Sequence, residues 1–294
     1  MIRKLAIIGV GLIGGSMARA LREEGVVQEV VGCGRGKANL DKAVELGVID
    51  HYTHEVKTAV EGADLVVLAV PLGAMQASFE ALRGVLAEDA VVTDVGSVKG
   101  SVVEDARRVF GQVPPFFVPG HPIAGTERSG VEAAFAELFR NRRVILTPLQ
   151  ETDPRALDRV EQVWKLCGAE VTQMTVAHHD EVLAATSHLP HMLAYSLVDS
   201  LARLKENDEI FRYAAGGFRD FTRIASSNPT MWRDICLANS QALGQMLQRF
   251  ADELKDLAAL LQAGDSDGLL ELFERAKAAR DRYVDGIRAR KNGD

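Results

Sequence analysis

The first half of the chain alternates short apolar runs with amphipathic segments. The apolar runs are rich in β-branched residues, as strands buried on both faces of a parallel sheet are. In the segments between them, the spacing of hydrophobic residues predicts helices that pack one face against a sheet. The predicted strands cover residues 5–8, 29–32, 65–70, 91–94, 116–118, 144–147 and 170–174, and the predicted helices cover residues 14–24, 37–46, 74–86, 100–110 and 154–167. This alternation predicts βαβ units and an α/β fold with a doubly wound sheet.

From about residue 176 the pattern is helical to the end of the sequence. We therefore predict two domains, a sheet domain over residues 1–175 and an all-α domain over residues 176–294. One helix of the second domain carries apolar residues at alternating spacings of four and three, which places them on one seam. These are Leu243, Leu247, Phe250, Leu254, Leu257 and Leu261. Spacing alone leaves open whether this seam packs inside the chain or against a second subunit.

Composition narrows the class of protein. With 47% hydrophobic and 26% charged residues in 294, the chain is typical of a soluble globular protein. The net charge of -7 argues against nucleic-acid binding, and no run approaches the ~20 apolar residues of a membrane span. Cys33, Cys167 and Cys236 are far apart and form no CxxC pattern, so we expect reduced thiols, no metal site and a cytoplasmic location.

A glycine fingerprint follows the first predicted strand. In Gly9-x-Gly11-x-x-Gly14, the first glycine suits a tight turn, the second lets a pyrophosphate approach the backbone, and the third allows close helix–strand packing. The start of the next helix would supply N–H donors to the phosphates. We therefore predict a Rossmann-like dinucleotide-binding domain. The predicted cofactor site comprises Gly9, Gly11, Leu12, Ile13, Gly14, Arg35, Val70, Pro71 and Ser97.

The choice of dinucleotide depends on the end of the second predicted strand. An acidic residue there normally binds the ribose 2′-hydroxyl of NAD. The sequence has Gly32-Cys33-Gly34-Arg35 instead, and an arginine at this place favours the 2′-phosphate of NADP. The alternative is that Arg35 stacks on adenine or faces solvent. The predicted cofactor is therefore NADP or NAD, with NADP slightly favoured.

The segment 121–127, HPIAGTE, places an imidazole, a hydroxyl and a carboxylate directly after a predicted strand. Ligands of open α/β sheets bind beyond the carboxyl ends of the strands, and a histidine there can accept a proton near neutral pH. The alternative is a turn in which His121 only caps the next element.

Further segments complete a series. They are DVGSVKG at 94–100, GHPIAGTE at 120–127, TSHLPH at 186–191 and GGFRDFTRIASSNPTMWRDI at 216–235. With the N-terminal GVGLIGGS, this series closely resembles the prephenate/arogenate dehydrogenase family of tyrosine biosynthesis, over nearly the whole chain. The resemblance implies an N-terminal Rossmann-like doubly wound sheet followed by an all-α dimerisation domain. It also implies a homodimer that oxidatively decarboxylates prephenate or arogenate, between which the sequence does not choose.

The resemblance implies roles for individual residues. His121 would take the proton of the substrate's C4 hydroxyl, Ser97 would orient that hydroxyl and the nicotinamide, and Arg223 would bind a carboxylate. His188 and His191 would line the substrate cavity, with His191 counted among the catalytic residues. The remaining residues expected to line or close the pocket are Thr126, Glu127, Gly216, Asp220 and Trp232.

Each of these residues also has a purely structural alternative. Asp220 and Arg223 are three apart and could form a local ion pair. His188 and His191 flank Pro190 and could mark a helix start, and Trp232 could be ordinary core.

Three other functions compete with this one. His178-His179-Asp180, with the histidines that follow, is open to interpretation as the metal site of a phosphohydrolase. A β-hydroxyacid dehydrogenase or imine reductase would share the two-domain architecture, and a non-catalytic nucleotide sensor would share the fingerprint. The occurrence of Ser97, His121 and Arg223 together favours the dehydrogenase. The sequence offers no separate ligand-sensing domain, so we expect tyrosine to act as a competitive inhibitor.

Overall fold

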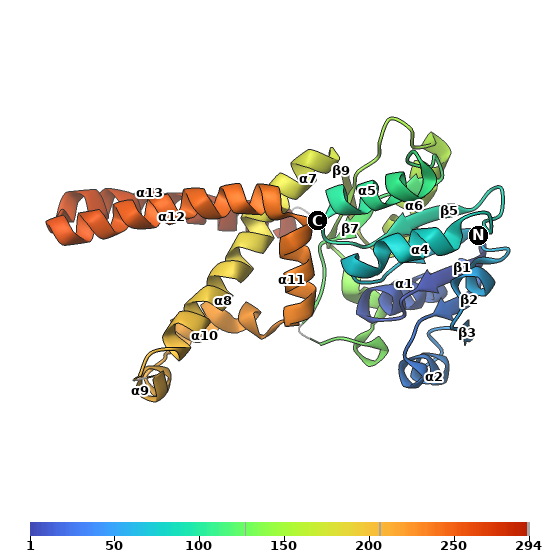
Figure 1. The fold of residues 1–294 in the computed structure, drawn as a ribbon, viewed down its shortest axis with the longest axis horizontal. Coiled ribbons are helices and arrows are strands. Elements are labelled where there is room, and N and C mark those ends of the chain that lie inside the picture. The colour runs from blue at the N-terminus through green and yellow to red at the C-terminus, as the bar shows by residue number, and fades with distance from the viewer. Residues whose placement is uncertain (127, 206, 293–294) are drawn as a thin grey trace. The chain divides into compact units, whose positions relative to one another are not determined.

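Six parallel strands form the main sheet, in the order β3-β2-β1-β4-β5-β6 (Figure 1). The computed structural model describes residues 1–126, 128–205 and 207–292. The strand order reverses direction between β1 and β4, which is the switch point of a doubly wound sheet. The strands are β1 (Ile2–Ile8), β2 (Val27–Cys33), β3 (His51–Thr53), β4 (Leu65–Leu68), β5 (Val91–Asp94) and β6 (Phe117–Val118). The predicted α/β fold is confirmed.

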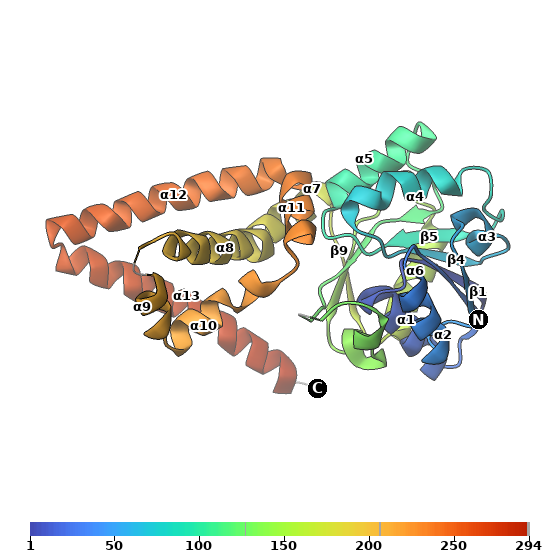
Figure 2. The ribbon, with the colours of Figure 1, turned by 60° about the horizontal axis from the view of Figure 1, so that its bottom comes forward.

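Helices cover both faces of this sheet, as Figure 2 shows. Alternation along the strands explains why: in β1, Leu5 and Ile7 join one apolar cluster while Ala6 and Ile8 join the other. The first cluster packs against α1 (Leu12–Glu23), α2 (Lys37–Glu45) and α6 (Pro154–Leu166). The second packs against α3 (Val56–Val60), α4 (Met75–Leu82) and α5 (Lys99–Phe110).

A second sheet of three strands departs from the sequence prediction. It joins β7 (Gly120–Pro122), β8 (Arg143–Leu146) and β9 (Glu170–Gln173), with β7 antiparallel to β8 and β8 parallel to β9. The sequence predicted β8 and β9 but neither β7 nor β3, because three-residue strands carry too little alternation to be recognised. His121 therefore lies in a strand, paired with Ile145, and not in a turn.

The sequence after β9 is helical, as predicted. It begins with α7 (Val176–Leu183), a π-helical turn η4 (Ala184–His188) and α8 (Leu189–Ala202), which continue one another without a break. Pro190 has no N–H to donate to the preceding turn, and the widened π turn lies just before it. Shorter helices follow: α9 (Asn207–Arg212), α10 (Gly216–Thr222), η5 (Arg223–Ser226) and α11 (Pro229–Ala238).

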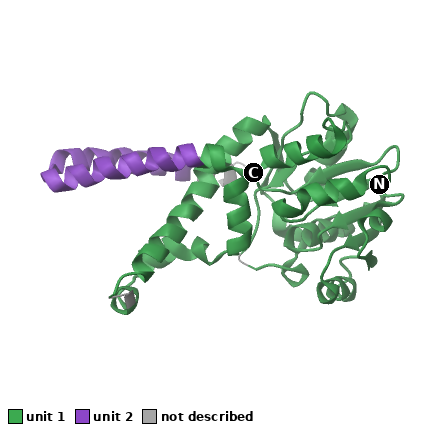
Figure 3. Cartoon of the chain, in the orientation of Figure 1, with its two compact units in different colours: residues 1–243 green, residues 244–294 purple. Residues whose placement is uncertain are grey.

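The chain divides into two compact units, residues 1–243 and residues 244–294 (Figure 3). All residues of the predicted site belong to the first unit. The second unit comprises most of α12 (Ser240–Ala263) and all of α13 (Ser266–Asn292). Across the described residues, no helix combines the length and the apolar character that crossing a membrane requires.

Candidate active site

The glycine loop has the geometry that its sequence predicts. Gly9 has φ +99°, and a Cβ on it would lie 2.2 Å from the carbonyl oxygen of Ala69. A Cβ on Gly14 would lie 2.7 Å from the oxygen of Gly9. By contrast, a Cβ on Gly11 would meet nothing within 4 Å, and no side chain caps the start of α1 there. The space beside Gly11 and the uncapped N–H groups of α1 fit a bound pyrophosphate.

The other predicted cofactor residues surround the same edge of the sheet. Arg35 is exposed two residues beyond the end of β2. Val70 and Pro71 follow β4, and Ser97 follows β5, half-buried just before α5. Strands β2, β4 and β5 thus bring these residues to the carboxyl edge of the main sheet, where β1 carries the glycine loop.

A buried ion pair joins the two sheets beside His121. Lys99 Nζ donates to Asp94 Oδ2 and, over 2.7 Å, to the carbonyl oxygen of Gly120. Gly120 N–H in turn donates to Asp94 Oδ1 over 3.1 Å. Burial lowers the pKa of the Lys99 ammonium group, against the opposing effect of Asp94. These contacts position the backbone immediately before His121. Neither Lys99 nor Asp94 was among the site residues predicted from the sequence.

His121 belongs to a chain of hydrogen-bonded side chains. Its Nδ1 lies 2.9 Å from Nε2 of His179, and Nδ1 of His179 lies 2.7 Å from Oδ1 of Asp180. Both histidines are buried. Burial lowers the pKa of His121 well below 6.5, and electrostatic interactions with His179, Lys99 and His188 lower it further. His121 is therefore neutral near pH 7, as a general base must be.

The segment 178–180 is not arranged as the metal-site interpretation required. Both ring nitrogens of His179 are engaged in hydrogen bonds, to His121 and Asp180, while His178 is exposed on the same helix. Within the described residues, no group of three or more His, Cys, Asp or Glu side chains is placed so that it could hold a metal ion.

His188 is buried by its position in the π turn. Asn239 Nδ2 donates to the carbonyl oxygen of Asp180 over 2.8 Å and to Nδ1 of His188 over 3.1 Å. Nδ1 of His188 is therefore the acceptor, and Nε2 carries the proton. Burial lowers the pKa of His188 to about 4, which the Asp180 carboxylate only partly opposes. Asn239 had no sequence signal, because only the fold brings it to His188.

His191 lies one turn further along the helix and stacks on Trp232. Their ring centroids are 3.6 Å apart, with 20° between the planes. Nδ1–H of His191 donates to the carbonyl oxygen of Ser187 over 2.9 Å, so Nε2 is free of a proton in the neutral ring. Burial and the nearby charge of Arg223 lower the pKa of His191, although the bond to Ser187 opposes them. Trp232 contacts this histidine within one chain, and its buried indole N–H has no hydrogen-bond partner among the residues that the structure describes.

Helix α11, which carries Trp232, packs against the cofactor half. Trp232, Ile235 and Val98 form a small apolar cluster, next to Ser97. In the same region a Cβ on Gly73 would lie 3.6 Å from Asp234 Oδ2. The helical segment of the first unit is thereby brought against the carboxyl ends of β4 and β5.

The remaining predicted residues include several that are exposed at the surface. Gly216 and Asp220 are exposed on α10, and Asp220 Oδ1 lies 3.8 Å from Nε of Arg219. Arg223 begins η5, which contacts α8. Thr126 is exposed and lines a hollow of about 280 Å³. Glu127 lies outside the described residues.

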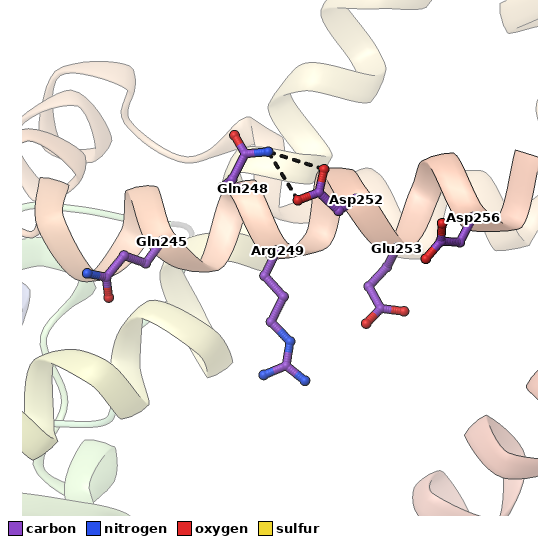
Figure 4. Close-up of a pocket in the computed structure, with 6 residues that line it drawn as sticks. All are labelled: Gln245, Gln248, Arg249, Asp252, Glu253 and Asp256. Carbon is purple, nitrogen blue, oxygen red and sulfur yellow. Dashed lines mark hydrogen bonds between the residues drawn. The ribbon is translucent and has the colours of Figure 1, made fainter.

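A different hollow lies along α12 and plays no part in the predicted site. It measures about 500 Å³, and only residues 245–256 of this one helix line it (Figure 4). Gln248 donates to both carboxylate oxygens of Asp252, four residues further along the helix.

Comparison with known proteins assigns the chain to a family. The family model described as the nucleotide-binding domain of prephenate dehydrogenase matches residues 17–173, and that of its dimerization domain matches residues 175–275. The chain belongs to the prephenate dehydrogenase family. Membership makes it an NAD(P)-dependent oxidoreductase, and it favours this assignment over a β-hydroxyacid dehydrogenase or an imine reductase.

Individual members of the prephenate dehydrogenase family resemble the chain along nearly its whole length. Cyclohexadienyl dehydrogenase of Zymomonas mobilis is 41% identical over 281 residues, which cover 95% of each chain. The crystal structure of Aquifex aeolicus prephenate dehydrogenase, in complex with hydroxyphenyl propionate and NAD+, has a TM-score of 0.89 at 38% identity and covers 95% of this chain and 98% of that one. Synechocystis arogenate dehydrogenase has a TM-score of 0.80 at 31% identity, with 95% and 99% covered.

Proposed function

We propose that this protein oxidises prephenate, arogenate or both, and that His121 is the base. The ring carbon that bears the C4 hydroxyl loses a hydride, the hydroxyl proton passes to His121 Nε2, and the ring carboxylate leaves as CO₂. The electron pair of the broken carbon–carbon bond makes the ring aromatic, and the proton returns to the phenolic oxygen. The nicotinamide supplies the hydride acceptor when it is bound.

The observation that carries this proposal is the state of His121. It is neutral, its ring makes a hydrogen bond to the described residues through Nδ1 only, and it lies beside the Lys99–Asp94 pair at the carboxyl edge of the main sheet. The ring of such a histidine stays unprotonated, and therefore able to act as a base, down to a pH well below 6.5. We therefore expect kcat to stay level as the pH falls through 6.5 and to decline only under more acidic conditions. A decline centred near pH 6.5 would contradict the neutral, buried base.

The other predicted residues complete the proposal. Ser97 orients the hydroxyl and the nicotinamide, and His191 accepts a hydrogen bond through its free Nε2. His188 offers the N–H of Nε2, and Trp232 walls the cavity. Arg223 binds a substrate carboxylate, and it is close enough to His191 for its charge to lower the pKa of that histidine. Thr126, Glu127, Gly216 and Asp220 line or close the pocket mouth.

The division of labour follows the proposed domains. Residues 1–175 bind the dinucleotide, and residues 176–294 bind substrate and form a homodimer. The dimerization-domain match and the exposed apolar residues of α12 support the dimer: Leu254 is 47% exposed and Leu261 is 63% exposed. Replacing both with glutamate should convert a dimer into a monomer in light scattering. A dimer that survives both changes would place the interface elsewhere.

For the cofactor, we propose NADP ahead of NAD, because exposed Arg35 stands where an acidic residue would contact the ribose of NAD. We also propose that tyrosine competes with substrate, since it shares the ring and the side chain. Competition predicts that tyrosine raises the apparent KM and leaves kcat unchanged. A tyrosine effect on kcat alone would contradict a shared site.

One assay tests the function directly. Formation of reduced nicotinamide is followed with prephenate and arogenate, each against NAD and NADP. Turnover of at least one pair is expected, and the pattern of rates identifies the preferred substrate and cofactor. No turnover in any of the four combinations would refute the proposed function.

A further inference from the structure

The carboxylate of Asp180 is the anchor of the hydrogen-bonded chain that ends at His121. Its Oδ1 accepts from the backbone N–H of Lys99 over 2.9 Å, and its Oδ2 accepts from that of Gly100 over 2.8 Å. Burial raises the pKa of Asp180, but the hydrogen bonds from His179 and from these two N–H groups outweigh it and hold the pKa below its usual value. Asp180 is therefore ionised and can only accept hydrogen bonds.

This anchor determines which nitrogen of His179 carries the proton. Because Asp180 Oδ1 can only accept, Nδ1 of His179 must donate across the 2.7 Å between them. In the neutral ring, Nε2 of His179 then has a lone pair. That lone pair faces Nδ1 of His121 at 2.9 Å, so Nδ1 of His121 must be the donor.

Because Nδ1 of His121 carries the proton, Nε2 of His121 has none. A neutral imidazole that donates through Nδ1 has its lone pair on Nε2. This nitrogen makes no hydrogen bond to any described part of the chain, so it is available to a substrate hydroxyl. If His179 were doubly protonated, it would donate to His121, and the proton of His121 would move to Nε2, where it would block the base.

We propose that His179 and Asp180 are positioning residues that hold His121 as the Nδ1–H tautomer, with the Nε2 lone pair directed to the substrate. The proposal rests on the proposed role of His121 as the base. The hydrogen bond between His121 and His179 links β7 to α7, and the backbone of α5 holds the carboxylate of Asp180. Three elements therefore fix the geometry of these three side chains. A carboxylate that sets the tautomer of a catalytic histidine is an established principle in hydrolases. Here a second imidazole lies between the two groups.

The hydrogen-bonded side chains of His121, His179 and Asp180 also have a role during turnover. When Nε2 of His121 accepts the hydroxyl proton, the ring becomes an imidazolium whose Nδ1–H still donates to His179. Burial disfavours the new positive charge on His121, and the nearby ammonium group of Lys99 disfavours it further. Asp180, through His179, supplies the compensating negative charge. Asp94 is neutralised by Lys99, so Asp180 is the carboxylate that acts on His121 through hydrogen bonds.

The tautomer can be measured in the resting enzyme. In protein labelled with ¹⁵N-histidine, long-range ¹H–¹⁵N correlation distinguishes Nδ1–H from Nε2–H, and loss of a signal in His121→Asn assigns it. We expect the Nδ1–H form in the wild-type protein at pH 7.5, and a shift towards Nε2–H in His179→Phe, which keeps the ring shape but cannot accept. His178→Phe, at the exposed neighbouring position, is the matched control and should change nothing.

Kinetics supply the second readout. His179→Phe should lower kcat by between about 10²- and 10⁴-fold with little change in KM, the range expected when a base is held in the wrong tautomer. His179→Gln should recover part of the rate, because its amide oxygen can accept from His121 Nδ1. If His179→Phe does not fold, the wild-type tautomer and His179→Gln decide the matter.

Two results would overturn the proposal. One is an Nε2–H tautomer of His121 in the wild-type enzyme, and the other is an unchanged tautomer and kcat in folded His179→Phe. Since the tautomer is measured without substrate or cofactor, it tests the positioning role separately from the reaction. Absence of turnover in the four-way assay would instead refute the proposed function and leave the tautomer result standing.

Discussion

His188 should make the protein sensitive to acid in a way that can be calculated. Its Nδ1 accepts from Asn239, and the side chain is 1% exposed, so a second proton would create two facing donors in a dry site. Its pKa is about 4 in the folded protein, against 6.5 for the free side chain. Each pH unit between these values is worth about 1.4 kcal/mol, so the full difference is about 3 kcal/mol.

The sign follows from which state binds the proton. As the pH falls through 6.5 the unfolded chain protonates at this histidine, while the folded protein does not until about pH 4. The free energy of unfolding therefore decreases over this window and loses up to about 3 kcal/mol from this residue. Protonation of the buried His121 should add to the loss in the same direction.

The assay compares urea unfolding of wild type and His188→Asn at several values between pH 7 and pH 4, at one protein concentration. The asparagine keeps an acceptor for Asn239 but does not titrate. At pH 7 the variant should be the less stable protein, because the contact with Trp232 is lost. Towards pH 4 its disadvantage should shrink by about 3 kcal/mol. His178→Asn, at an exposed position, should follow wild type. Parallel curves for wild type and His188→Asn would refute the claim that His188 is held neutral by burial.

The other predictions concern single residues of the proposed site. His121→Asn should lower kcat by ~10²-fold or more with KM within a few-fold of wild type in steady-state assays, and near-normal turnover would remove it as the base. Arg223→Ala should raise KM by about 10- to 100-fold, the value of one charged hydrogen bond, with Arg223→Lys in between; an unchanged KM would place the carboxylate elsewhere. Arg35→Asp should raise the KM for NADP by about 10- to 100-fold and leave that for NAD no worse, and equal effects on both cofactors would contradict a contact with the 2′-phosphate. Gly9→Ala should lower the free energy of unfolding by more than about 1 kcal/mol in thermal or urea denaturation, because φ is +99° and the Cβ would collide with the carbonyl of Ala69. Wild-type stability in that variant would show that the turn relaxes.

Apart from the three-residue β3, the strands of the main sheet could be predicted from sequence because their signals are local. Strand β5 begins with two valines and is buried throughout, and the predicted range, residues 91–94, agrees with the structure. The glycine loop carries its own backbone requirements, which Gly9 and Gly14 satisfy. The second sheet could not be predicted in the same way. Strand β7 is three residues long and owes its place to Asp94 and Lys99, whose contacts with Gly120 depend on the fold.

In the site, too, the features that depend on one segment could be predicted, whereas those that depend on distant segments could not. His121 stood out because it follows a strand, but its state depends on His179, which is 58 positions away. In the sequence, His179 and Asp180 were only the neighbours of a third histidine, in a pattern that was also open to interpretation as a metal site. Position on α7 separates the three: His178 faces solvent, while the two residues after it face His121 and the start of α5. A base is therefore recognisable from its own segment, whereas the groups that set its protonation are recognisable only once the fold has brought α7 against β7.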